Sequence, residues 1–165
     1  MPLPSPSLTP LAALLAATVL APALAVAAED DILLTVTDSD GAVLARLDME
    51  ALQALPARVI ETSTIWTDGI QVFTGVPLAT LMQDLAPEAQ SISATAINDY
   101  AVEIPRSGWA DGAALLAYLN HGEPMSLREK GPLWIVFPFD ADPAYRQEVV
   151  YARSIWQLDR ISVTE

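Results

Sequence analysis

Apolar and polar residues alternate along several short stretches of the chain, and this period of two predicts β-strands. Residues 32–37 and 42–47 alternate on either side of the turn-forming sequence DSDG, which predicts a β-hairpin. A second pair of strands, 91–97 and 100–104, is predicted around a polar turn at Asn98 and Asp99. Strands are also predicted at 58–64, 70–73 and 156–163, and the apolar run 133–138 predicts a buried strand.

Helical spacing is confined to short segments. Asp48 is suited to cap a helix that runs to Leu55, before a proline stops it. Pro77 suits the first position of a second helix, whose apolar residues share one face at i, i+3, i+4 and i+7: Leu78, Leu81, Met82 and Leu85. Residues 145–155 have helical character in pieces.

The segment 112–119 is apolar and short, so periodicity leaves a buried strand and a helix both open. With either outcome the elements predict one mixed α+β domain without internal repeats.

The first 28 residues differ in composition from the rest of the chain. They contain no charged side chain, are apolar from Leu11 to about Val26, and end in small residues before Glu29. This pattern predicts a secretory signal peptide over 1–28 and a domain over 29–165. Because no Lys or Arg precedes the apolar stretch, an uncleaved anchor is the alternative. We expect Sec-type export and a periplasmic location.

Charge and cysteine content exclude several classes of function. The net charge is −13, which repels phosphate backbones and excludes nucleic acid as a partner. The absence of cysteine excludes disulfides, thiolate metal ligands and thiol nucleophiles. The single histidine, His121, lies in the turn-like sequence NHGEP, where a solvated residue is favoured over a catalytic one.

Five sequence stretches occur in an order that resembles the molybdopterin-binding domain of the sulfite oxidase family. They are FTGVPLATLMQDL, NDYAVEIP, ALLAYLNHGEPM, REKGPLWIVFP and SIWQLDRISV, and together they extend over most of residues 32–163. The resemblance implies a fold of the sulfite oxidase (SUOX) type and a pocket shaped for a pterin.

The resemblance fails at one functionally important position. Enzymes of the family bind molybdenum through a cysteine in the loop that reads ETSTIW at 61–66 in this chain. A hydroxyl of Ser63 or Thr64 would be a poor substitute for that thiolate. The family's metalloenzymes also leave the cytoplasm by the twin-arginine route, whereas residues 1–28 contain no arginine. We therefore expect no molybdenum.

In its small size and its Sec-type signal, the chain resembles the metal-free periplasmic pterin-binding members of this fold (PruR-like). This resemblance implies a pterin receptor, without redox chemistry of its own, that reports to the periplasmic domain of an inner-membrane signalling protein. That partner would be a cyclic-di-GMP cyclase/phosphodiesterase or a sensor kinase. The alternatives are a molybdopterin-dependent oxidoreductase with non-cysteine ligation, and a scaffold protein with an empty pocket.

A pterin has a flat ring and an edge with an exocyclic amine beside a ring N–H, so its site needs an aromatic surface and a carboxylate. Trp66 lies in the loop that holds the metal ligand in the family, and both ring stacking and core packing are open for it. Trp134 lies in a predicted buried strand, which favours the core. Ser63 and Thr64 would lie where the thiolate would otherwise be.

The remaining candidates are polar or charged. Asp99 and Tyr100 match the family's D-G-Y turn, part of the cofactor-facing wall, although a solvated turn is equally open. Arg128 and Lys130 form a basic pair in the loop where the family contacts the pterin or its phosphate; solubility or docking to an acidic partner are the alternatives. Arg153 is expected either to contact the ligand in the pocket or to form a structural salt bridge. The candidate ligand-binding residues are Ser63, Thr64, Trp66, Asp99, Tyr100, Arg128, Lys130 and Arg153.

Overall fold

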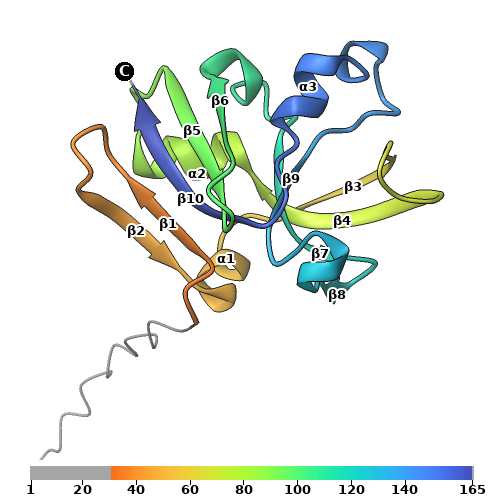
Figure 1. Cartoon of the computed structure of the whole chain (residues 1–165), viewed down its shortest axis with the longest axis horizontal. Helices are drawn as coiled ribbons and strands as arrows, with labels where there is room; N and C mark the ends of the chain where they lie inside the picture. The colour runs from red at the N-terminus through yellow and green to blue at the C-terminus, as the bar shows by residue number, and fades with distance from the viewer. Residues whose placement is uncertain (1–30, 165) are drawn as a thin grey trace, which may run out of the picture.

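A computed structural model describes residues 31–164, which form two β-sheets accompanied by short helices (Figure 1). The predicted signal peptide at 1–28 lies outside the described residues. Within 31–164, no helix is long and apolar enough to cross a membrane.

The first sheet has five strands, and its central pair joins the two ends of the described chain. β1 and β10 are parallel, whereas every other pair in this sheet is antiparallel. The predicted hairpins at 32–47 and 91–104 are both confirmed. In spatial order the strands are β2 (Val43–Leu47), β1 (Leu34–Thr37), β10 (Leu158–Thr164), β5 (Ser91–Ala96) and β6 (Ala101–Pro105).

The second sheet is antiparallel and is built around one buried strand. Its strands are β3 (Arg58–Ser63), β4 (Ile70–Pro77), β7 (Leu115–Asn120) and β8 (Glu123–Pro124), and β9 (Trp134–Val136) also pairs with β7. The segment left open between strand and helix is therefore β7. Leu116 packs in one hydrophobic cluster and Leu115 in another, so both faces are buried and the sequence reads as a continuous apolar run.

The helices are short and follow their local sequence signals. Asp48 caps α1 (Met49–Ala54) by accepting a hydrogen bond from the Ala51 N–H at 2.8 Å, as predicted. α2 (Leu78–Leu85) begins one residue later than predicted. Pro77 has an extended backbone and ends β4, so it occupies the N-cap position of α2 and lies outside the helix.

One α-helix and three single 3₁₀ turns complete the domain. They are α3 (Glu148–Arg153), η2 (Arg106–Gly108), η3 (Leu127–Glu129) and η4 (Pro143–Tyr145). The predicted helical pieces at 145–155 thus correspond to the end of η4 and to α3. Figure 1 shows α3 near β6 and β9, on the opposite side of the molecule from α1.

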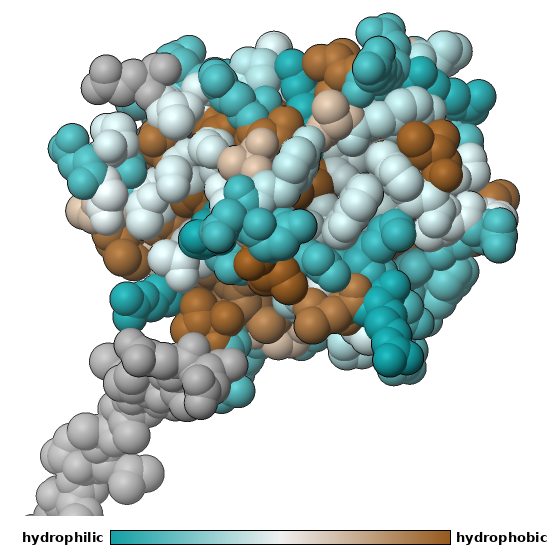
Figure 2. All heavy atoms as spheres, in the orientation of Figure 1, coloured by the Kyte–Doolittle hydropathy of each residue, from teal (hydrophilic) through white to brown (hydrophobic). Residues whose placement is uncertain are grey.

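The main hydrophobic core lies between the two sheets and includes the buried face of α2. A smaller cluster covers the other face of the second sheet and contains Phe73, Leu115 and Trp134. Trp66 packs against both clusters from the loop that connects β3 to β4. Figure 2 shows polar residues over much of one face, with apolar side chains gathered near α1 and β7. The described chain is a single mixed α+β domain, as predicted.

Candidate functional site

The loop between β3 and β4 is folded so that it directs the Trp66 indole against the domain. The Thr64 hydroxyl oxygen accepts a hydrogen bond from the Trp66 backbone N–H at 3.1 Å and lies 2.7 Å from the Thr67 hydroxyl oxygen. Such hydroxyl-to-backbone bonds stabilise tight loops at the expense of extended pairing. The half-buried Trp66 ring is thereby held at the junction of the two hydrophobic clusters.

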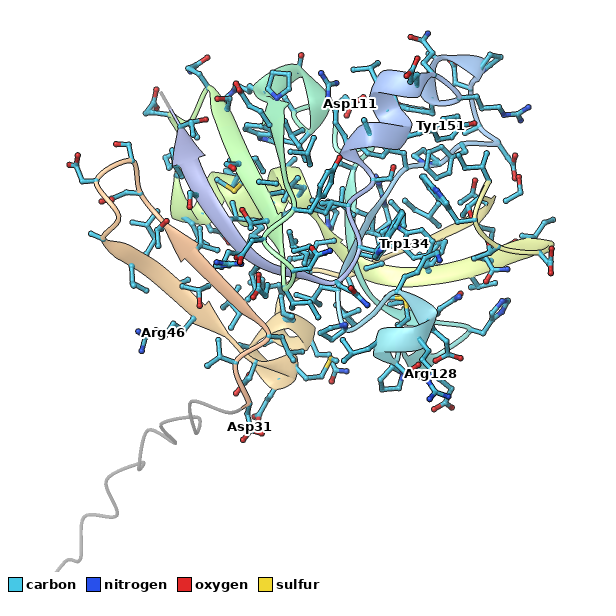
Figure 3. The ribbon with its side chains drawn as sticks, in the orientation of Figure 1. Asp31, Arg46, Asp111, Arg128, Trp134 and Tyr151 are labelled. Atoms are coloured by element: carbon cyan, nitrogen blue, oxygen red, sulfur yellow. The ribbon has the colours of Figure 1, made fainter. Side chains whose placement is uncertain are left out.

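Trp66 is the centre of a cluster of aromatic side chains. Its ring makes edge-to-face contacts with Trp134, Phe139, Tyr151 and Trp156, at centroid distances of 5.9, 6.1, 5.7 and 5.6 Å. Each such pair contributes about 0.5–1.5 kcal/mol beyond the area it buries. Figure 3 shows Trp134 on β9 and Tyr151 on α3. The cluster therefore combines segments that are far apart in the chain.

A cavity of about 450 Å³, which we call the aromatic cavity, lies on one side of Trp66. This volume lies within the roughly 300–1,000 Å³ of small-molecule sites. None of the side chains that line it within residues 31–164 carries a charge, so it favours a flat and largely apolar ligand. The lining residues are Trp66, Ala96, Asn98, Tyr100, Tyr151, Ala152, Ser154, Ile155, Trp156 and Gln157.

A second cavity, of about 440 Å³, also borders Trp66 but has a polar and charged lining. We call it the polar cavity. The Lys130 ammonium lies 5.1 Å from the centroid of the Trp156 ring and 5.9 Å from that of Trp134, which places a cation beside the aromatic cluster. The lining residues are Trp66, Thr67, Gln71, Asn120, His121, Glu123, Pro124, Met125, Arg128, Glu129 and Lys130.

Glu129 on the wall of the polar cavity is held by its own turn. Its carboxylate accepts hydrogen bonds from the Ser126 hydroxyl at 2.8 Å and from the Ser126 backbone N–H at 3.1 Å. These two bonds lower the pKa of the Glu129 carboxyl. The turn that carries Arg128 and Lys130 is therefore closed by a capping box.

Left-handed backbone conformations concentrate at the two cavities. Within residues 31–164, four non-glycine residues have positive φ: Asp99, His121, Lys130 and Gln157. Gln157 lines the aromatic cavity, His121 and Lys130 line the polar cavity, and Asp99 lies between two residues that line the aromatic cavity. Such conformations cost energy and cluster at functional sites in proteins. Their distribution marks the surroundings of Trp66 as the candidate site.

Ser63 has a different environment from that of Trp66. Its backbone N–H and its hydroxyl both donate to the Asp140 carboxylate, the hydroxyl at 2.7 Å. Arg146 also donates to this carboxylate at 3.2 Å. The Ser63 N–H, then the Ser63 hydroxyl, and more weakly the Arg146 charge hold the pKa of the Asp140 carboxyl below its usual range. The Ser63–Asp140 pair thus joins the end of β3 to the segment that leads into α3.

Replacing Ser63 by alanine should raise the pKa of Asp140 towards its ordinary value, because the hydroxyl donor is lost while the backbone N–H remains. In the wild type the pKa is lowered by folding. The contribution of this carboxylate to stability is therefore present above the unfolded value of about 3.9 and is lost as the pH falls through the folded value. A carboxyl-carbon NMR titration of Ser63→Ala measures the shift. Ser107→Ala, an exposed serine on η2, is the control, and an identical Asp140 titration in all three proteins would contradict the assignment.

The predicted site residues separate into three groups. Trp66 and Tyr100 line the aromatic cavity, and Arg128 and Lys130 line the polar cavity. Four others are not among the residues that line either cavity: Ser63, Thr64, Asp99 and Arg153.

The Ser63 and Thr64 contacts are those described above, and the other two side chains also lie against other groups. The Asp99 side chain is 81% exposed and accepts a hydrogen bond from Arg160 at 2.7 Å. The Arg153 side chain runs over Gly108, where an added Cβ would lie 3.4 Å from its Nη1 atom. Neither side chain is therefore placed to contact an occupant of the aromatic cavity in this conformation.

Tyr151, Trp156 and Gln157 line the aromatic cavity but are absent from the sequence-based candidates. All three belong to the segment YARSIWQL, which runs from the second half of α3 to the first residue of β10. Two aromatic residues in so short a segment were the available signal. Their relation to Trp66 depends on the approach of this segment to the β3–β4 loop.

Comparison with known proteins does not assign a function, so an assignment has to be argued from the residues at the two cavities. Neither the protein-family models nor the curated proteins contain a match to this chain. Among residues 31–164, no group of three or more His, Cys, Asp or Glu side chains is arranged to hold a metal ion. The fold and its two cavities define the class of protein: a small α+β domain with a cavity lined by aromatic side chains.

Proposed function

We propose that this protein is a periplasmic pterin-binding receptor of the sulfite oxidase molybdopterin-binding (SUOX) fold. The proposal assigns it no redox chemistry of its own. The aromatic cavity supports the ligand class: Trp66, the residue expected to stack on the ring, shares this cavity with Tyr100, Tyr151 and Trp156. A planar heteroaromatic ring fits such walls because it can stack on one ring and meet the edges of others.

The second part of the proposal is that the bound state is reported to the periplasmic domain of an inner-membrane cyclic-di-GMP enzyme or sensor kinase. Two side chains at the cavity support this part: Tyr100 is 56% exposed and Trp156 is 37% exposed. An occupied cavity would therefore change a surface that a second protein can contact. Ligand-dependent co-purification with such a membrane protein tests this step separately from ligand binding.

The alternative enzyme would use a hydroxyl of Ser63 or Thr64 as a molybdenum ligand. In the described loop the Ser63 hydroxyl donates to Asp140, and the Thr64 hydroxyl accepts from Trp66 and contacts Thr67. Either hydroxyl would have to leave these partners to bind a metal. Metal analysis of protein purified from the periplasm separates the two proposals, since stoichiometric molybdenum would overturn the receptor.

Titration of the purified protein with a tetrahydropterin is the direct test. We expect saturable quenching of tryptophan fluorescence, because Trp66 and Trp156 both line the aromatic cavity. Calorimetry on the same samples gives the stoichiometry, which should be one ligand per chain. The proposal fails if neither reduced nor oxidised pterins bind.

A further inference from the structure

Gln157 is held in a left-handed conformation at the wall of the aromatic cavity. Its φ is 53°, and its backbone bonds on both sides: its N–H donates to the Lys130 carbonyl at 3.1 Å, and its carbonyl accepts from the Ile97 N–H at 2.9 Å. Its side-chain Nε2 donates to the Leu127 carbonyl at 2.9 Å. Three hydrogen bonds, two to the η3 turn and one to Ile97 after β5, therefore fix both the backbone and the amide.

The Leu127 contact also determines which way the Gln157 amide faces. A carbonyl can only accept, so the atom that meets it must be the NH₂ group, and Oε1 is the other end of the amide. No hydrogen bond to Oε1 is formed within residues 31–164. The residue lines the aromatic cavity and supplies a hydrogen-bond acceptor of fixed orientation that has no protein partner.

Asn98 supplies the complementary group on the same cavity. Its Oδ1 accepts a hydrogen bond from the Tyr100 backbone N–H at 3.2 Å, which assigns the amide and leaves Nδ2 as the free donor. Asn98 also lines the aromatic cavity. The two amide side chains of the lining thus present one free acceptor and one free donor beside the aromatic rings.

We propose that Gln157 determines ligand specificity, its Oε1 accepting a hydrogen bond from an exocyclic amine on the bound ring. Asn98 Nδ2 then donates to a ring carbonyl of the same ligand. This inference rests on the proposed function and deepens it: the ligand is an amino-oxo pteridine, and a neutral amide takes the role that sequence reasoning gave to a carboxylate such as Asp99. The left-handed backbone at Gln157 is part of this arrangement because it brings the side chain between Leu127 and the cavity.

The test compares pterin, which has an exocyclic amine, with lumazine, which has an oxygen at that position. An acceptor that the bound ligand covers and that meets another oxygen stays without a donor, so we expect the wild type to prefer pterin by about tenfold. Gln157→Gly should abolish most of this preference. Glycine adopts a positive φ without strain, so the variant should fold although it has no side-chain amide.

Two further variants make the comparison specific. Gln157→Glu keeps an acceptor but loses the hydrogen bond to the Leu127 carbonyl, so its preference for pterin should be smaller than that of the wild type and larger than that of Gln157→Gly. Gln90→Gly removes another glutamine whose Nε2 bonds a backbone carbonyl, that of Glu88 at 3.0 Å, at the opposite end of β5, and should keep the preference.

The outcomes distinguish the two proposals. If the wild type binds neither ligand, the proposed function itself fails. If it binds both with equal affinity, or if Gln157→Gly retains the full preference, the protein still binds pteridines but Gln157 does not select them. Thermal unfolding of each variant confirms that the compared proteins are folded.

Discussion

Trp66→Ala should weaken pterin binding by at least about tenfold. The ring forms part of the wall of the aromatic cavity, and stacking on it contributes about 0.5–1.5 kcal/mol beyond buried area, where 1.4 kcal/mol corresponds to tenfold. The variant also loses four aromatic contacts. Because Trp66 is half-buried, we expect a stability loss of about 2 kcal/mol, below the 3–5 kcal/mol typical of a fully buried tryptophan. The domain should remain folded.

Calorimetric titration of wild type and Trp66→Ala with a tetrahydropterin measures the effect. Trp109→Ala is the matched control, since Trp109 is buried in the main core and is not among the residues that line either cavity. That control should lower the midpoint of thermal unfolding without changing the affinity of the folded protein. Equal affinities of wild type and Trp66→Ala would remove Trp66 from the site.

Gly75→Ala should destabilise the domain by at least about 3 kcal/mol, because overpacking against backbone cannot be relieved by a rotamer change. A Cβ at Gly75 would lie 2.1 Å from the Leu116 carbonyl oxygen and 2.6 Å from the Ala117 Cα. Both neighbours belong to β7, which pairs with β4 at a register shift between Thr74 and Gly75. Relief would require the two central strands of the second sheet to separate.

Gly41→Ala provides the comparison for this effect. Nothing lies within 4 Å of a Cβ at Gly41, so the cost there is only that of a left-handed backbone, about 1 kcal/mol. Chemical denaturation of both variants measures the difference. A loss at Gly75 no larger than that at Gly41 would show that β4 and β7 can separate locally at little cost.

Local sequence signals predicted most of the elements because the relevant physics is local. The DSDG turn needs only its own residues: the Asp38 carboxylate accepts from the backbone N–H groups of Asp40 and Ala42. The Asp48 cap is equally local. Prediction failed to decide β7, since a strand buried on both faces has no period of two to read. The one-residue error at Pro77 arose because proline suits both the end of a strand and the start of a helix.

Only part of the lining of the aromatic cavity was predicted. Trp66 was chosen because it lies in the loop that holds the metal ligand in the family, and it lines the cavity. Asp99 was chosen because it matches the family's D-G-Y turn, but it pairs with Arg160 instead. Gln157 could not be found from the sequence, because a glutamine becomes a fixed acceptor only when another segment binds its NH₂ group. That segment, the turn containing Leu127, is 30 residues away.

The sequence by itself determined most of the strand and helix segments, the single α+β domain, the excess of acidic residues and the absence of thiol chemistry. These follow from composition, period and turn residues, which act over a few neighbours. Only the tertiary structure decided that Trp66 meets Tyr151 and Trp156, that Ser63 is bound by Asp140, and that Gln157 faces the aromatic cavity. The contacts of Trp66 and Ser63 join residues more than 70 positions apart, and Gln157 is held by Leu127, Lys130 and Ile97 from other segments. Their geometry is set by how these segments pack in the folded domain.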